Sequence, residues 1–144
     1  MSTLGRYPVR LELQVLWGDM DALRHVNNAV YARWLEQARI AYFERLGLTG
    51  DLTVGPILAR QTIDFRSPVT YPDRVHLAVT VERLGTTSIA LRYRGTSEAQ
   101  SGAVVVEGES VVVVFDYARG TKVPIGDDLR ARIEALEAAG AETR

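Results

Sequence analysis

Residues 17–28, Trp-Gly-Asp-Met-Asp-Ala-Leu-Arg-His-Val-Asn-Asn, are the stretch that decides the fold. They place two acids, a histidine and two asparagines directly before the longest helical pattern of the chain. There, apolar residues recur at spacings of three and four, which predicts a helix over 28–46. Asn27 or Asn28 can cap its first turn, and Gly47 can end it. The helix therefore directs its free N–H groups and the positive end of its dipole at carboxylates, an arrangement that can bind or polarise an electron-rich oxygen.

The composition is that of one globular domain. The chain has 144 residues, of which 47% are apolar, so it can bury a core without disulfides or metal. Its formal net charge of −1 argues against a general binder of nucleic acids or anionic membranes. The lack of cysteine excludes disulfides, thiolate catalysis and cysteine-ligated metals. Neither a signal-like segment nor a membrane-length apolar run occurs, and we therefore expect a cytoplasmic protein.

The remaining sequence alternates as strands do. We predict strands over 8–17, 57–66, 75–81, 89–93 and 104–115, separated by a turn-rich stretch over 47–56, breakers near Pro68 and Pro72, a turn at Gly85 and a loop over 95–102. Gly108 is expected to form a bulge or bend in the last strand. Asp127 could cap a short terminal helix with the apolar stripe Leu129, Ile133 and Leu136.

This order of elements predicts an α+β fold with two layers. One long helix packs against an antiparallel sheet, whose second to fifth strands are joined by short loops and so favour a meander. The run Val111–Phe115 is too apolar for an exposed edge and should lie inside the sheet or at an interface. Because one helix cannot cover the whole sheet, we expect the chain to form dimers, often by pairing of sheet edges.

The central motif resembles that of a known family. Residues 19–31, Asp-Met-Asp-Ala-Leu-Arg-His-Val-Asn-Asn-Ala-Val-Tyr, with 34–39, Trp-Leu-Glu-Gln-Ala-Arg, are similar to the signature of hotdog-fold acyl-CoA thioesterases of the 4-hydroxybenzoyl-CoA thioesterase-like family. The segments 65–73 and 84–89 resemble the same family more weakly. The resemblance implies one hotdog domain over 1–144, in which a long central helix is wrapped by a five-stranded antiparallel sheet.

The family also implies a chemistry. Its members hydrolyse acyl-CoA or acyl-carrier-protein thioesters as dimers or tetramers, with active sites at subunit interfaces. By this resemblance the second acid, Asp21, acts as nucleophile or general base, and the backbone amide at Asn28 polarises the thioester carbonyl. The resemblance implies no metal or organic cofactor, since coenzyme A is part of the substrate.

Two positions depart from related patterns. Arg24 replaces the family's usual glycine before His25. If that glycine serves a turn with positive φ, the loop must differ or accept strain. If it serves close approach of substrate, Arg24 narrows the site or adds a phosphate contact. Leu23 stands where the similar plant acyl-carrier-protein thioesterases carry a further catalytic asparagine. The residues that bind the coenzyme A phosphates vary in the family, and the candidates are Arg60, Arg66, Arg83, Arg92, Arg119 and Lys122.

Each candidate residue also has a structural interpretation. Asp21 could order the loop as an Asx-turn residue, although the surrounding motif favours catalysis. Asp19 is interpreted as structural, accepting bonds from loop amides. His25 is equally consistent with a structural role and with orienting Asp21 or contacting substrate. The only other histidine, His76, lacks ligand-like spacing to it, so no metal site is expected.

The long helix offers three further candidates. Glu36 lies two turns from Asn28 on roughly the same face, where some hotdog enzymes carry a catalytic acid, but an ion pair with Arg33 or Arg39 is the preferred interpretation. Trp34 is expected in the core and Tyr31 at an interface, and either could line an acyl pocket.

Two other functions are possible on this fold. A hydratase or dehydratase would pair an aspartate and a histidine five residues apart in a loop containing Asn-Pro. Here Asp21 and His25 are four apart and Asn-Pro is absent. A non-catalytic acyl-thioester-binding protein that senses its ligand would carry a basic DNA-binding segment, and the chain has none. Thioester hydrolysis is therefore the preferred function.

Overall fold

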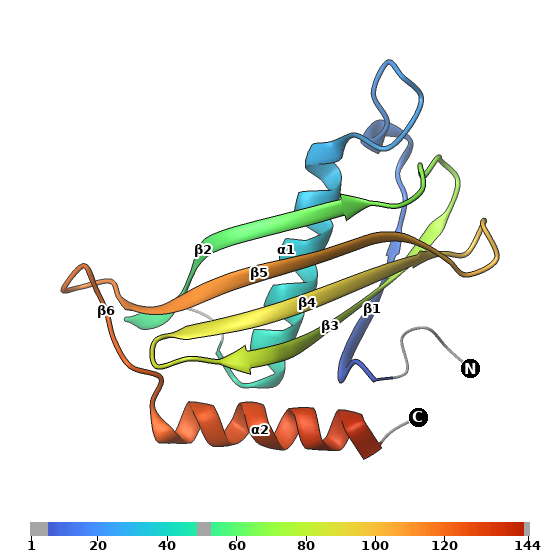
Figure 1. Ribbon diagram of the computed structural model, residues 1–144. Coiled ribbons are helices and arrows are strands. Elements are labelled where there is room, and N and C mark those ends of the chain that lie inside the picture. The colour runs from blue at the N-terminus through green and yellow to red at the C-terminus, as the bar shows by residue number, and fades with distance from the viewer. Residues whose placement is uncertain (1–5, 49–52, 143–144) are drawn as a thin grey trace.

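The computed structural model describes residues 6–48 and 53–142. Figure 1 shows the elements in chain order: β1 (Val9–Gln14), the 3-10 turn η1 (Trp17–Asp19), α1 (Asn28–Arg45), β2 (Val54–Phe65), β3 (Arg74–Leu84), β4 (Ser88–Ser97), β5 (Ala103–Asp116), β6 (Thr121–Lys122) and α2 (Asp127–Glu142). In the described ranges, neither helix is long and apolar enough to cross a membrane.

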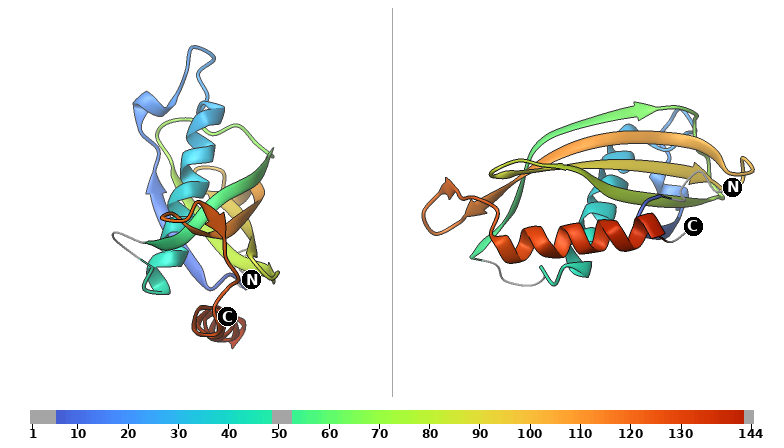
Figure 2. Two further views of the ribbon diagram at one scale, coloured as in Figure 1. Left: turned by 90° about the vertical axis from the view of Figure 1, so that its left-hand side faces the viewer. Right: turned by 60° about the horizontal axis from the view of Figure 1, so that its bottom comes forward.

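All strands belong to one antiparallel sheet. Its order is β1-β3-β4-β5-β2, and β6 pairs with the end of β5. The sheet curves around α1, which crosses its strands on the concave side (Figures 1 and 2). The predicted α+β class and the hotdog arrangement of a central helix wrapped by a sheet are thus confirmed. The five predicted strands are joined by a sixth, the two-residue β6, which the sequence pattern did not indicate.

The predicted meander holds only for β3, β4 and β5. β2 pairs with β5 at the far edge of the sheet, and β3 pairs with β1 instead. The reason is that the connection between β2 and β3, residues 66–73, is long enough to pass from one edge toward the other. This connection runs next to the loop that precedes α1, because the Val26 N–H donates to the Val69 carbonyl at 2.9 Å.

Several strand boundaries differ from those predicted. β1 ends at Gln14 rather than residue 17, because the next N–H groups leave the ladder: Val15 donates to the Asp73 carbonyl and Leu16 to the Asp19 carboxylate. β2 begins at Val54, inside the predicted turn-rich stretch over 47–56. Of that stretch, residues 49–52 lie outside the described residues.

The core lies between α1 and the concave face of the sheet. The predicted helical stripe faces it, and its members Val30, Trp34, Leu35, Ala38, Tyr42 and Leu46 are all buried, while Ala41 is half-buried. The run Val111–Phe115 lies inside the sheet as predicted, with β2 on one side and with β4 and then β6 on the other. α1 contributes most of its apolar side chains to this one cluster, so its position relative to the sheet is fixed along its whole length.

Two glycines that suggested a loop and a bulge serve close packing instead. Gly95 lies within β4, where a Cβ would come within 2.7 Å of Val106 Cγ1 and 2.9 Å of Leu77 Cδ2. At Gly108 a Cβ would lie 2.8 Å from Leu35 Cδ1. The β5 ladder passes through Gly108 without a change of register, so the bulge predicted there is wrong. Because Gly95 lies within β4, the loop predicted over 95–102 is shorter than expected and comprises only the turn between Ser97 and Ala103.

Both ends of α1 are capped, the first by a side chain and the second by backbone hydrogen bonds. At its start, the Asn27 side-chain oxygen accepts a hydrogen bond from the Ala29 N–H at 2.8 Å. At its end, Gly47 has a φ of +80° and donates to the Glu44 carbonyl, while Leu48 donates to the Phe43 carbonyl, which is the Schellman arrangement. The helix ends predicted from Asn27 and Gly47 are confirmed.

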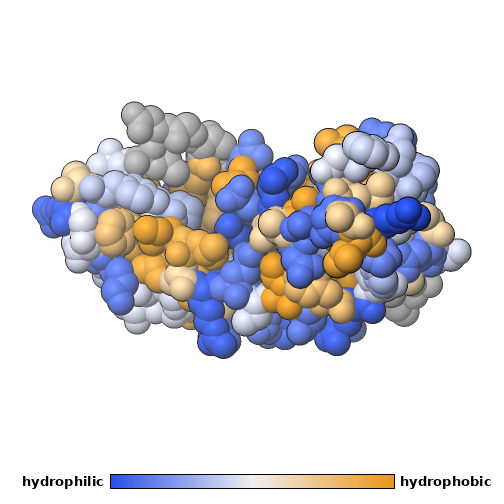
Figure 3. All heavy atoms as spheres, turned by 90° about the horizontal axis from the view of Figure 1, so that it is seen from above, coloured by the Kyte–Doolittle hydropathy of each residue, from blue (hydrophilic) through white to orange (hydrophobic). Residues whose placement is uncertain are grey.

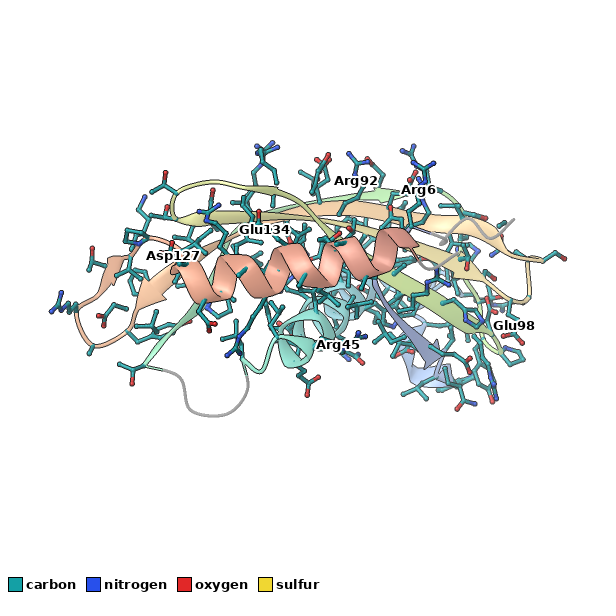
Figure 4. The ribbon with its side chains drawn as sticks, turned by 90° about the horizontal axis from the view of Figure 1, so that it is seen from below. Arg6, Arg45, Arg92, Glu98, Asp127 and Glu134 are labelled. Atoms are coloured by element: carbon teal, nitrogen blue, oxygen red, sulfur yellow. The ribbon has the colours of Figure 1, made fainter. Side chains whose placement is uncertain are left out.

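α2 is clamped to the rest of the domain and is longer than the short helix predicted. The Glu137 carboxylate accepts hydrogen bonds from the Tyr42 hydroxyl at 2.6 Å, the Thr80 hydroxyl and the Val81 N–H. Burial, and secondarily Glu137, raise the pKa of Tyr42, so its hydroxyl stays protonated and donates. The predicted stripe of Leu129, Ile133 and Leu136 contacts the core. Viewed from below, α2 lies in front of α1 and runs from Asp127 across the sheet (Figure 4).

Substituting Gly108 with alanine tests the seating of α1. The added Cβ would meet Leu35 and the Thr62 carbonyl, at 2.8 and 2.9 Å, so α1 or β2 must shift. We expect the free energy of unfolding in urea to fall by about 1–3 kcal/mol, the usual cost of overpacking. Gly126→Ala is the matched control, because its Cβ would enter open space. Equal effects of the two substitutions would show that the close contact at Gly108 is unimportant.

Candidate active site

The acid-rich loop forms a small hairpin. Met20 and Val26 form an antiparallel bridge. Inside it, the Asp21 N–H donates to the His25 carbonyl at 3.1 Å, and the Arg24 N–H donates to the Asp21 carbonyl at 2.9 Å. This is the bonding pattern of a three-residue hairpin loop whose last residue adopts a left-handed conformation. Asp21 and His25 consequently flank the hairpin, at the junction between loop and bridge.

Arg24 occupies the left-handed position of this hairpin. Its φ is +65°, which places it among the two non-glycine residues with positive φ in the described ranges. Such a conformation costs a non-glycine residue about 1–3 kcal/mol. For Arg24 the sequence left open an altered loop, a strained turn with positive φ, a narrowed site or a phosphate contact. The structure shows the strained turn, because the position has a positive φ and the arginine adopts it. Its side chain is exposed.

The base of the hairpin is fixed by Asp19. Its carboxylate accepts a hydrogen bond from the Leu16 N–H at 2.8 Å, and its carbonyl accepts one from the Asn27 N–H at 2.9 Å. These contacts fit the structural role expected for Asp19. From the other side, the connection over 66–73 contributes the Tyr71 N–H, which lies 3.5 Å from the Met20 sulfur. The hairpin is therefore held against the start of α1.

The Asp21 carboxylate is exposed and oriented by two donors. Oδ1 accepts a hydrogen bond from the Leu23 N–H at 2.8 Å, and Oδ2 accepts one from the Asn27 side-chain amide at 3.2 Å. The first bond is the Asx turn considered as the structural interpretation of Asp21. The second ties the carboxylate to the residue that caps α1. Since neither bond buries the carboxylate, it remains accessible to a reacting group.

Asn28 is the first residue of α1 and is exposed. No described residue accepts a hydrogen bond from its backbone N–H, as is usual for the first turn of a helix. The cap is made by the neighbouring Asn27, whereas the sequence left the choice between the two asparagines open. A free donor at the positive end of a helix dipole thus follows directly after the residue that holds Asp21.

The His25 imidazole stands apart from Asp21. It is exposed, and within the described ranges it makes no hydrogen bond; only its carbonyl is bonded, to the Asp21 N–H. His76 lies elsewhere, on β3, where its ring pairs with Glu98 at 2.9 Å. In the part of the chain that the structure describes, no group of three histidine or acidic side chains could hold a metal ion.

Of the remaining helix candidates, Trp34 lies in the core as expected, whereas Glu36 and Tyr31 differ from expectation. Glu36 is exposed, and among the described residues it pairs with neither Arg33 nor Arg39, so the expected ion pair is wrong. Tyr31 is buried between Trp34 and Phe65, with ring centroids 4.8 and 5.0 Å away, and burial raises its pKa. Tyr31 and Trp34 therefore both belong to the core of the single chain.

Sequence reasoning missed the buried environment of Arg39. The residue is 7% exposed, and its guanidinium donates to the Gln61 side-chain oxygen at 3.1 Å and to the Tyr93 hydroxyl at 3.3 Å. The Tyr93 hydroxyl in turn shares a hydrogen bond with Ser110. Only the position of Arg39 on the apolar side of the helical pattern could have indicated its burial, since charged residues are rarely buried without a partner.

Three of the six candidate phosphate-binding residues are already paired with acids. Arg66 contacts Asp64 and Glu107, Arg92 (Figure 4) contacts Glu82, and Arg119 contacts Asp116. In the described part of the chain Arg60, Arg83 and Lys122 make no ion pair. Burial alone would raise the pKa of Glu107, but Arg94 and Arg66 outweigh it and lower that pKa. The structure brings none of the six next to Asp21 through a hydrogen bond or ion pair.

Comparisons with known proteins show the family and the fold. The family model described as the thioesterase-like superfamily matches residues 15–133. The chain is 34% identical to the PA2801 protein of Pseudomonas aeruginosa, covering 86% of this chain and 96% of that one with a TM-score of 0.80. It is 32% identical to a thioesterase of Thermus thermophilus solved with coenzyme A and Zn, covering 92% and 96% with a TM-score of 0.81. The gentisyl-coenzyme A thioesterase BH1999, at 22% identity, 87% and 99% coverage and a TM-score of 0.78, shares the fold.

Replacing Arg24 with glycine should relieve the strain of the hairpin. Glycine adopts a φ of +65° freely but loses more entropy on folding, so we expect a net gain of about 0.5–1 kcal/mol in the free energy of unfolding, measured in urea. Arg24→Ala removes the same charge but keeps a Cβ, and we expect no gain from it. If both variants are stabilised equally, removal of the charge rather than of the strain accounts for the effect.

Proposed function

The chain belongs to the thioesterase-like superfamily and has the hotdog fold, and from this premise we propose that it hydrolyses an acyl-CoA thioester to a free acid and coenzyme A. One observation carries the proposal. The exposed Asp21 carboxylate is held by Asn27, and the next residue, Asn28, offers a free N–H at the start of α1. A base or nucleophile beside a donor for the developing oxyanion is the minimum that thioester hydrolysis needs.

Asp21 supplies the reactive group. As a general base it takes a proton from water, which adds to the thioester carbonyl; as a nucleophile it attacks that carbonyl itself, and water later hydrolyses the resulting anhydride. In either case the thiolate of coenzyme A leaves and is protonated. Two hydrogen bonds fix the direction of the carboxylate before substrate arrives, which favours reaction by orientation.

The Asn28 N–H supplies the electrophilic assistance. A thioester carbonyl placed against the first turn of α1 gains a hydrogen bond that strengthens as negative charge develops on its oxygen. The helix dipole acts in the same direction. We assign His25, the third candidate, a contact with substrate, because its exposed imidazole makes no hydrogen bond to Asp21. The mechanism requires no metal or organic cofactor, and a cytoplasmic location stays a prediction from the sequence.

We further propose that the working enzyme is a homodimer or homotetramer. Asp21, His25 and Asn28 are all exposed, whereas a thioester carbonyl reacts best where bulk water is excluded. Trp17 and Leu23 beside them are 73% and 79% exposed. β2 is an edge strand of the sheet, and its apolar side chains Val54, Ile57, Leu58 and Phe65 are exposed. Seen from above, hydrophobic patches lie among hydrophilic residues on this face (Figure 3). A second copy would cover these patches and enclose the site.

The competing functions give different products in one assay. A panel of acyl-CoA and acyl-carrier-protein thioesters, varied in chain length and aromaticity, is followed by release of free thiol. A hydratase or dehydratase would instead change the ultraviolet absorbance of an enoyl-CoA without releasing thiol. A non-catalytic binder would do neither but would bind the thioester.

Asp21→Asn tests the catalytic assignment. It keeps the size and part of the bonding of the side chain but removes the base and nucleophile. With the best thioester of the panel, we expect kcat to fall by about 10²–10⁴, the scale for losing a general acid–base group, or further if Asp21 is the nucleophile. KM should change little, and the thermal midpoint should fall slightly because the bond to the Asn27 amide is lost.

Glu36→Gln is the control for this experiment, because Glu36 is an exposed acid two turns into α1 and makes no ion pair among the described residues. We expect it to cost much less activity. Near-full turnover by Asp21→Asn together with loss of turnover in Glu36→Gln would transfer the catalytic role to the helix acid. Unchanged thiol release in both variants would refute the mechanism.

Sedimentation tests the assembly. At micromolar concentration we expect no dominant species of 15.9 kDa. Ile57→Lys places a charge on the exposed β2 edge, which should release monomers and abolish thiol release although the hairpin is untouched. Ala138→Lys, on the exposed side of α2, adds the same charge as a control and should do neither. A fully active monomer would contradict a site completed by a second copy.

A further inference from the structure

We propose that Asn27 is a positioning residue that joins the Asp21 carboxylate to the start of α1 through the two ends of its own side-chain amide. The amide nitrogen donates to Asp21 Oδ2 at 3.2 Å, and the amide oxygen accepts from the Ala29 N–H at 2.8 Å. The inference rests on the proposed function, because it assigns Asn27 a role in that same site.

The chemistry of the two partners determines which way the amide points. The Ala29 N–H can only donate, so it must face the amide oxygen, while an ionised carboxylate can only accept, so it must face the amide nitrogen. No other common side chain of this length provides an acceptor and a donor on one carbon. Aspartate or serine in place of Asn27 would cap α1 about as well, but neither could keep both bonds to these two partners in this geometry.

The backbone of Asn27 reinforces the link. Its N–H donates to the Asp19 carbonyl at 2.9 Å, and its carbonyl accepts from the Val30 N–H at 2.9 Å. Asn27 therefore contacts both the base of the hairpin and the first turn of the helix. Because Asn28 follows it directly, the carboxylate and the free N–H proposed to act on one thioester keep a constant separation. The Asp21 carboxylate and the Asn28 N–H are thus positioned relative to each other before substrate binds.

A double-mutant cycle tests the bond itself. Asn27→Asp keeps the cap but places two carboxylates together, and Asp21→Asn places two amides together so that one bond is lost. The combined variant reverses the polarity of the pair: the amide introduced at position 21 still accepts from the Leu23 N–H and donates to the carboxylate introduced at position 27, which still caps α1. We expect each single variant to unfold more readily than the wild type. If the two effects were independent, their free-energy changes would add in the double variant. We expect the unfolding equilibrium constant of the double variant to be about tenfold smaller than this additive value.

Kinetics test the consequence for the proposed reaction. Asn27→Ser keeps the cap but replaces the amide with a shorter hydroxyl group, which we expect not to reach Asp21, and it adds no charge. We therefore expect kcat to fall about tenfold while KM stays near that of the wild type. Asn27→Asp should in addition move the acid limb of the pH–rate profile upward by about one pH unit, because a second carboxylate disfavours ionisation of Asp21. The other charged or titratable groups of the hairpin, Asp19, Arg24 and His25, are unchanged in each variant.

The outcomes separate this inference from the proposed function. Additive unfolding effects in the cycle would overturn the Asn27–Asp21 bond, whether or not any thioester is hydrolysed. A kcat and an acid limb that stay at wild-type values in both Asn27→Ser and Asn27→Asp would reduce Asn27 to a helix cap. Strong coupling in the cycle without thiol release from any thioester, by the wild type included, would keep the bond and reject thioester hydrolysis.

Discussion

The seating of α1 on the concave face of the sheet is the contact on which the rest of the structure depends. It is close enough that Gly108 leaves no space for a methyl group beside Leu35, and it buries the helix along its whole apolar face. Since interiors are packed at the density of crystals, a helix held in this way has little freedom to slide or rotate. The first turn of α1 is therefore a fixed reference point, and the hairpin that carries Asp21 is attached to it through Asn27 and Asp19.

The sequence predicted the parts of this design that depend on local periodicity. The long helix, its two ends and the apolar run inside the sheet follow from residues close together in the chain, and the motif around Asp21 carries the family resemblance. The placement of β2 beside β5 could not be derived, because strand partners far apart in sequence are chosen by packing and not by pattern. Gly95 and Gly108 show the same limit: local chemistry marks them as breaks, whereas their neighbours across the sheet require the absence of a side chain.

Much of the candidate site was visible as composition but not as geometry. The acids, the histidine and the asparagines are adjacent in sequence, yet only the structure shows that Asp21 is bonded to Asn27 and not to His25. Arg24 needed the observed φ to distinguish a strained turn from an altered loop. The burial of Arg39 could not be predicted for a different reason. Its guanidinium donates to Gln61 and Tyr93, and Tyr93 bonds to Ser110; these neutral residues lie on three different strands, which no spacing rule connects to Arg39.

The position of β2 at the edge of the sheet affects how readily the newly folded chain aggregates. A twelve-residue strand on the edge of the sheet, with exposed aliphatic and aromatic side chains, offers unpaired backbone groups to any other extended chain. Until another chain covers this edge, each newly folded copy is exposed to aggregation through it. In the assembly proposed above, pairing with a second copy and aggregation would compete for the same edge, so the yield of refolded protein would depend on which of the two occurs faster.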